Sequence, residues 1–139
     1  MDSKTPIIYE AFLDVRFGDL DPYGHVNASR YLDYVVSSRW TFLERTQSIS
    51  SAELVRRGLA FFMTKATTEF RKPIAGAAQV RVRSHVGTLE GARLVTPFEI
   101  ASADGATVHA TGHLDFAIMN LETRKPMALP DWAMPLFFQ

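Results

Sequence analysis

The chain has 139 residues, of which 47% are hydrophobic and 22% are charged, which fits one compact domain with a buried core. Its 15 basic and 15 acidic side chains cancel, so no broad charge favours nucleic acid or an anionic membrane. Cysteine is absent, which excludes disulfides and a thiolate nucleophile, and neither an apolar run of about 18 residues nor a signal peptide is visible. We therefore expect a single domain over residues 1–139, without a membrane span, in the cytoplasm.

A strand and a long helix are predicted first. Residues 10–17 alternate between apolar and mixed positions, which predicts a β-strand over this stretch. Apolar residues then recur with the spacing of one helical face over about 28–45, directly after Asn27, which is a good N-cap residue. This helix carries so much apolar surface, Trp40 included, that we expect it to be largely enclosed.

A short helix and a run of strands follow. Ser50 and Glu53 have the spacing of a capping box, which predicts a second helix that stops at Gly58. Four further strands, separated by glycine- and proline-containing turns, are predicted over 59–71, 79–89, 92–101 and 107–120. The pattern indicates an α+β fold in which an antiparallel sheet of about five strands wraps a long central helix. Such a sheet has open edges, and pairing of two copies would close one of them.

The segment between the first strand and the long helix carries the candidate chemistry. Asp21 precedes a proline, which disfavours helical backbone at the residue before it, so Asp21 is expected to be extended at a strand end. The helix start offers unpaired NH groups near Asn27 and Ala28, which can polarise a carbonyl oxygen beside the carboxylate. From spacing alone, an equally good interpretation is that Asp19 and Asp21 are turn and capping residues and that His25 lies on the surface.

Residues 17–22, Phe-Gly-Asp-Leu-Asp-Pro, followed by Gly24 and Tyr31, resemble the signature of hotdog-fold acyl-CoA thioesterases of the 4-hydroxybenzoyl-CoA thioesterase type. The resemblance implies a single hotdog domain over nearly the whole chain, with Asp21 as the catalytic carboxylate. It also implies a homodimer with two sites at the interface, often doubled to a homotetramer.

The stretch after the turn resembles two groups of thioesterases. Gly-His-Val-Asn at residues 24–27 matches variants that act mostly on fatty acyl-CoA. The same stretch resembles plant thioesterases that act on acyl carrier protein, in which the histidine at the place of His25 belongs to the site. Tyr23 departs from that second pattern, because the plant enzymes carry a catalytic asparagine there. We therefore favour the bacterial type of mechanism.

The resemblance implies hydrolysis of an acyl-CoA to a free acid and CoA, with Asp21 attacking the carbonyl or activating a water. A thiolate is a good leaving group, so no metal or organic cofactor is expected. Beside the catalytic candidates Asp21 and His25, the predicted substrate-binding residues are Tyr23, Asn27, Ala28, Tyr31, Met63, Thr64 and Arg71. By family analogy Met63 and Thr64 would come from a partner subunit, and Arg71 is a candidate for a CoA phosphate.

Other functions are less well supported. A hydratase on acyl thioesters would commonly use a histidine in a different motif, and a noncatalytic acyl-CoA-binding module remains an alternative. No Gly-x-Ser-x-Gly elbow or dinucleotide fingerprint occurs. His109 and His113 would lie about 13 Å apart on a strand, too far to share a metal ion. The aromatic residues Phe61, Phe62 and Phe70 are assigned to the core rather than to an acyl tunnel, and some of them could serve as both.

Overall fold

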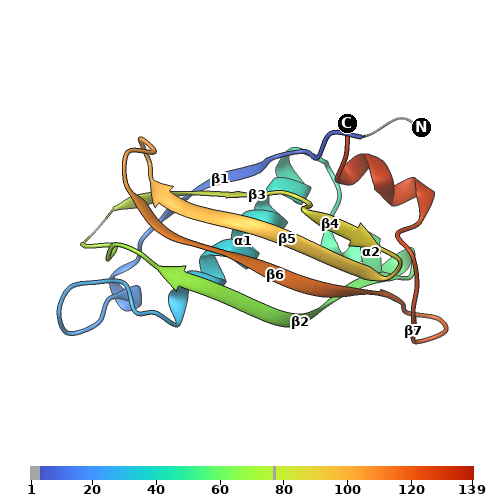
Figure 1. The fold of residues 1–139 in the computed structure, drawn as a ribbon, viewed down its shortest axis with the longest axis horizontal. Coiled ribbons are helices and arrows are strands. Elements are labelled where there is room, and N and C mark those ends of the chain that lie inside the picture. Colours follow the sequence, from blue (N-terminus) through green and yellow to red (C-terminus); the bar gives the residue numbers. More distant parts are fainter. Residues whose placement is uncertain (1–3, 77) are drawn as a thin grey trace.

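The computed structural model describes residues 4–76 and 78–139 as a curled antiparallel sheet with one long helix lying against it (Figure 1). The helices are α1 (Arg30–Arg45) and α2 (Ser51–Arg56), and 3-10 turns span Phe17–Asp19 and Asp131–Leu136. The strands are β1 (Tyr9–Asp14), β2 (Leu59–Phe70), β3 (Gln79–Ser84), β4 (Thr88–Glu90), β5 (Arg93–Ser102), β6 (Val108–Asn120) and β7 (Lys125–Pro126). The path through the sheet is β1-β3-β5-β6-β2, with β4 beside β5 and β7 beside β6. The predicted α+β hotdog fold is confirmed.

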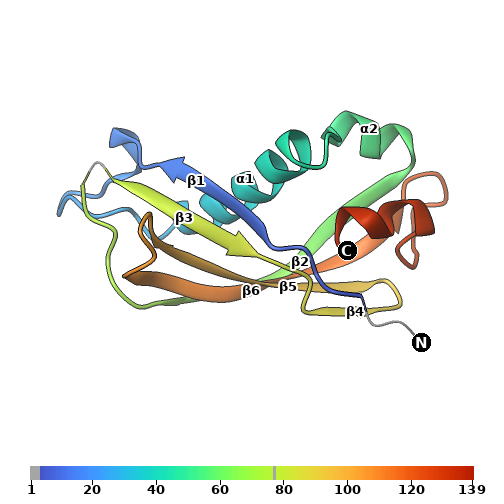
Figure 2. The same ribbon diagram turned by 90° about the horizontal axis from the view of Figure 1, so that it is seen from above.

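The core lies between α1 and one face of the sheet (Figure 2). Alternate residues of β5 point into it, and Leu94, Phe98 and Ile100 are buried. Tyr34 and Val35 of α1 pack toward this face and are also buried. The alternation seen in the sequence therefore corresponds to one apolar face of the sheet that meets the apolar stripe of the helix.

The long helix differs from its prediction in two ways. It begins at Arg30 with Ser29 as N-cap rather than with Asn27, because the Asn27 side chain accepts a hydrogen bond from the Ser29 NH (2.9 Å) in a turn that precedes the helix. Its outer face is also open in the single chain, where Trp40 is 37% exposed and Glu44 is exposed. The prediction of a largely enclosed helix is therefore wrong for one chain.

Two strands are shorter than predicted. The first strand ends at Asp14, and Phe17 stands in a 3-10 turn with 93% of its surface exposed. The strand predicted over 79–89 divides into β3 and β4. Ser84 pairs with Phe98, and the next residue of β5 in line is Pro97, which has no NH to donate to the ladder. Regular pairing of β3 therefore stops at Ser84.

The predicted second helix is confirmed, with the side chain of its N-cap serine accepting from the Glu53 NH.

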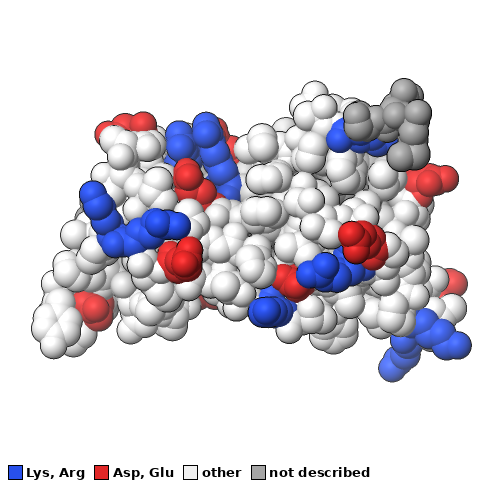
Figure 3. Space-filling view, in the orientation of Figure 1, with Lys and Arg blue, Asp and Glu red and all other residues white. Residues whose placement is uncertain are grey.

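Charges of both signs are scattered over the sheet face seen in Figure 3, which agrees with the zero net charge of the chain. Cross-strand ion pairs such as Arg81–Glu99 (3.6 Å) and Arg93–Asp115 (3.3 Å) contribute to this mixture. In the described part of the chain, no helix has both the length and the apolar character needed to cross a membrane.

Candidate active site

A tight turn holds Asp21 shortly before α1. The Asp21 NH donates to the carbonyl oxygen of His25 (2.7 Å), and Gly24, with a φ of 78°, allows the chain to reverse. Leu20 and Val26 form an antiparallel bridge on either side of the turn. Asp21 therefore belongs to a small hairpin of its own and not to the end of the first strand, which already stops before the 3-10 turn.

The same turn orients the carboxylate of Asp21. Its Oδ1 accepts hydrogen bonds from the NH groups of Tyr23 (2.9 Å) and His25 (3.1 Å). Within residues 4–76 and 78–139, no hydrogen bond to Oδ2 is found. One oxygen is thus fixed by the backbone, and the other can still take a proton or attack a carbonyl carbon.

Asp21 lines a surface hollow of about 350 Å³, which we call the Asp21 hollow. Its walls are supplied by the turn and the start of α1 (Asp21, His25, Val26, Ala28, Tyr31) and by the end of β2 with the loop after it (Phe70, Arg71, Lys72, Pro73). The two walls touch where the Tyr31 and Phe70 rings pack edge to face, with centroids 4.9 Å apart. The fold thus brings five predicted residues together: Asp21, His25, Ala28, Tyr31 and Arg71.

The other predicted binding residues lie outside this hollow. Tyr23 is 85% exposed, and Asn27 is exposed at the turn before α1. Met63 lines a separate cavity between α1 and the sheet, and the Thr64 hydroxyl donates to a backbone carbonyl of β6 (3.2 Å). The expected contribution of Met63 and Thr64 from a second copy of the chain stays a prediction.

Fewer NH groups are free at the start of α1 than predicted. The Asn27 NH donates to the carbonyl oxygen of Asp19 (2.8 Å), and the Arg30 NH donates to that of Asn27 (2.9 Å). Ser29 uses its NH to reach the Asn27 side chain. Of the two NH groups predicted to polarise a thioester, only that of Ala28 lacks an acceptor within the described residues. The prediction for Asn27 is wrong because its NH already ties the turn to Asp19.

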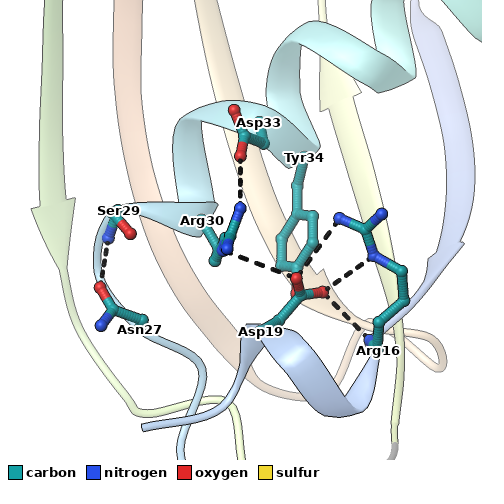
Figure 4. Close-up of polar contacts among 7 residues, drawn as sticks. All are labelled: Arg16, Asp19, Asn27, Ser29, Arg30, Asp33 and Tyr34. Atoms are coloured by element: carbon teal, nitrogen blue, oxygen red, sulfur yellow. Dashed lines mark hydrogen bonds and ion pairs between the residues drawn. The ribbon is translucent and has the colours of Figure 1, made fainter.

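Asp19 fastens the 3-10 turn to α1 (Figure 4). Its carboxylate accepts hydrogen bonds from the Tyr34 hydroxyl (2.7 Å) and the Arg16 NH (3.0 Å), and Arg30 Nε lies 3.7 Å away. Burial opposes ionisation of Asp19, which is 2% exposed, but the hydrogen bonds from Tyr34 and Arg16 outweigh it and hold the pKa of this carboxyl below its usual value. Asp19 is therefore a charged anchor beneath the turn that carries Asp21.

The end of β2 contributes more to the hollow than the sequence indicated. Phe70 is 56% exposed and Phe62 is 67% exposed, so their assignment to the core is wrong for the single chain, whereas Phe61 packs against the core as predicted. Arg71 donates to the Thr111 hydroxyl (3.2 Å) and stays exposed at the rim of the hollow. The sequence signal for this wall of the hollow was the run Phe-Arg-Lys-Pro at a strand end. The two cations and the aromatic ring of this run cannot all be buried there.

Comparisons with known proteins identify the family. The model of the thioesterase-like superfamily matches residues 15–137. Long-chain acyl-CoA thioesterase FadM of Escherichia coli (strain K12) is 27% identical over 117 residues, 84% of this chain and 87% of FadM. The chloroplastic acyl-acyl carrier protein thioesterase ATL3 of Arabidopsis thaliana is 30% identical over 86 residues, 62% of this chain and 45% of ATL3. Among solved structures, YbaW, a probable thioesterase from Escherichia coli, has a TM-score of 0.77 at 26% identity, covering 87% of this chain and 90% of that chain.

The region matched by the family model contains the turn with Asp21, the whole of α1 and every strand from β2 onward. Both walls of the Asp21 hollow therefore lie inside it. The chain belongs to the thioesterase-like superfamily and is a thioester hydrolase.

Proposed function

We propose that the protein hydrolyses acyl-CoA to a free acid and CoA, and that Asp21 is its catalytic carboxylate. The observation that carries this proposal is the geometry of Asp21, whose Oδ1 is fixed by two NH groups while the carboxylate lines an open hollow. The likeness to FadM, named as a long-chain acyl-CoA thioesterase, supports CoA as the thiol and a fatty acyl chain as the acid.

In the proposed reaction, the thioester carbonyl lies in the hollow with its oxygen toward the Ala28 NH. Asp21 either attacks the carbonyl carbon to form a mixed anhydride, which water then hydrolyses, or removes a proton from the attacking water. The Ala28 NH stabilises the negative charge that develops on the oxygen. The thiolate of CoA leaves without metal or cofactor assistance, and CoA phosphates would meet Arg71 and Lys72, which line the rim of the hollow.

Acyl carrier protein is the second candidate for the thiol partner, because the matched segment of ATL3 is 30% identical to this chain. Family membership favours hydrolysis over the hydratase and binding-module alternatives.

Thiol release tests the proposal. The purified protein is incubated with acyl-CoAs of several chain lengths and with the same acyl groups on acyl carrier protein, and free thiol is measured over time. We expect a kcat/KM for the best acyl-CoA that exceeds the value for the matching acyl carrier protein substrate. No hydrolysis of any acyl-CoA would contradict the proposed function, and preference for the carrier protein would make the second candidate correct.

His25 is expected to have a secondary role. Its backbone NH and carbonyl hold Asp21, and both groups survive in His25→Ala. We therefore expect this substitution to lower kcat by less than about 10-fold and to raise KM, as for a residue that contacts substrate. His85→Ala, which lies outside the hollow, is the matched control. A loss of kcat beyond about 10³-fold with an intact fold would instead show that Asp21 and His25 act as a pair.

Pairing of two copies through β2 is expected to complete the site. β2 ends the strand path of the sheet, and its Phe62 is 67% exposed, so a second copy would cover an open edge. Phe62→Lys should convert a dimer or tetramer into monomers and lower activity, as measured by light scattering and thiol release. Phe12→Lys on the opposite edge strand, where Phe12 is 48% exposed, should leave the β2 dimer intact. A fully active monomer would contradict the shared site.

A further inference from the structure

A second cavity, of about 170 Å³, lies between α1 and the inner face of the sheet, and we call it the Arg39 cavity. Much of its wall is aromatic or contains sulfur, with contributions from Trp40, Phe61, Met63, Phe116 and Phe137, and Arg39 also lines it. An apolar cavity of about 150 Å³ is large enough to bind benzene. The Arg39 cavity can therefore take a ring or a short run of methylenes.

Arg39 is buried in this wall, and its side-chain hydrogen-bond partner among the described residues is the neutral Ser84. Arg39 is 9% exposed, its Nη1 donates to the Ser84 hydroxyl (3.0 Å), and its guanidinium carbon lies 4.8 Å from the centre of the Tyr9 ring. No ion pair to Arg39 is formed within residues 4–76 and 78–139. A guanidinium has five NH donors, so most of them are left for a ligand. Burial lowers the pKa of Arg39 to about 10, and the group therefore remains a cation at neutral pH.

A second polar group is buried on the same side of the sheet. Thr96 is fully buried, and its hydroxyl has no hydrogen-bond partner in the described part of the chain. Thr96 follows Leu94, which lines the Arg39 cavity, by two residues and so shares its face of β5. Within the described residues, the other buried side-chain polar atom without a partner is Arg81 Nε, and neither Thr96 nor Arg81 lines the Arg39 cavity. The group that indicates an oxygen-bearing ligand in this cavity is therefore the Arg39 guanidinium, with one hydrogen bond to Ser84 and further NH donors.

α1 and β2 connect the Arg39 cavity with the Asp21 hollow. Tyr31 and Phe70 line the hollow, whereas Arg39 and Met63 line the cavity. Arg39 follows Tyr31 by eight helical residues, a rise of about 12 Å. On β2, Ala66 and Thr68 lie between Met63 and Phe70 on the same inward face, and Ala66 is exposed and Thr68 half-buried, so the side chains along this stretch are small. A linear chain fits this path better than a compact group next to the thioester.

We propose that the Arg39 cavity receives the distal end of the acyl chain and that Arg39 selects chains whose distal end carries an oxygen acceptor, above all a carboxylate. This inference rests on the proposed thioesterase function. A carboxylate accepts two parallel hydrogen bonds from a guanidinium and neutralises it. A terminal methyl group leaves the buried cation unpaired, and sites with unpaired polar groups discriminate strongly against such analogues.

Kinetics with chains of equal length test the selection. The substrates are decanoyl-CoA, 10-hydroxydecanoyl-CoA and the monothioester of decanedioic acid with CoA. We expect kcat/KM for the decanedioyl substrate to exceed that for decanoyl-CoA by at least about 10-fold, with the hydroxyl substrate between them. Arg39→Met should abolish this preference, so that kcat/KM for the decanedioyl and decanoyl substrates becomes equal within about threefold, because the guanidinium that pairs with the distal oxygen is gone.

The control is Arg57→Met. Arg57 also stacks on an aromatic ring, with its guanidinium carbon 4.8 Å from the centre of Trp132, but it is exposed and lines no part of the Arg39 cavity. This variant should keep the wild-type preference. Equal kcat/KM for the decanoyl and decanedioyl substrates in the wild type, or a preference that survives Arg39→Met, would overturn the proposal.

A binding measurement separates this proposal from the proposed function. In Trp132→Phe protein, Trp40 in the cavity wall is the one tryptophan, and its fluorescence is followed during titration with decanoate or decylammonium. We expect decanoate to change the Trp40 signal at concentrations at least about 10-fold lower than decylammonium, because only an anion pairs with Arg39. Equal responses to both ligands, or no response to either, would overturn the assignment. An anion-selective response in a protein without acyl-CoA hydrolysis would refute only the proposed function.

Discussion

Asp21→Asn is expected to lower kcat for acyl-CoA hydrolysis by about 10² or more without unfolding the protein. Asparagine keeps an oxygen that can accept from the NH groups of Tyr23 and His25, so the turn should persist. It removes the negative charge needed to attack a carbonyl or to take a proton from water. Steady-state thiol release gives kcat and KM, and the loss should appear in kcat because substrate contacts in the hollow are kept.

Asp14→Asn serves as the control for loss of one carboxylate. Asp14 is exposed at the end of β1 and does not line the Asp21 hollow, so its substitution should leave kcat within about twofold. Urea unfolding should show less than about 1 kcal/mol difference between Asp21→Asn and wild type. If Asp21→Asn kept near-normal turnover, Asp21 would not be the catalytic carboxylate.

Asp19→Asn is expected to lower the free energy of unfolding by about 2 to 3 kcal/mol. The substitution removes a buried charge that accepts from the Tyr34 hydroxyl and the Arg16 NH. The NH2 group of asparagine is itself a donor, so it cannot accept hydrogen bonds from the groups that face this carboxylate. The exposed guanidinium of Arg16 contributes little, since it is well solvated. Asp33→Asn, which breaks only an exposed pair with Arg30 on α1, should cost less than about 0.5 kcal/mol.

The stabilising effect of Asp19 should depend on pH. Because the pKa of Asp19 is lowered in the folded state, its contribution is present above the unfolded value of about 3.9 and is lost as pH falls through the folded value. The stability difference between wild type and Asp19→Asn should thus be constant near neutrality and shrink in acid below about pH 4. Urea unfolding at a series of pH values measures it, and a difference that stays constant into acid would mean that Asp19 is not held as a charged acceptor.

Local sequence signals located the candidate chemistry because the turn is built from neighbouring residues. Gly24 supplies the positive φ, and Asp21 and His25 are joined by hydrogen bonds that span only four residues. The hydrogen bond of the Asn27 NH could not be predicted from such local signals. Its partner, the Asp19 carbonyl, is reached only when the 3-10 turn folds back beside the helix start.

Three features could be predicted from the sequence: the order of strands and helices, the apolar face of the sheet and the proximity of Asp21 to a helix start. Each depends on periodicity or on turn residues close together in the chain. Only the tertiary structure placed Phe70 and Arg71 opposite Asp21 and buried Arg39 in the core, where none of the described residues forms an ion pair with it. These placements depend on how β2 and α1 lie across the curled sheet, and contacts between residues far apart in the chain leave no local pattern that predicts them.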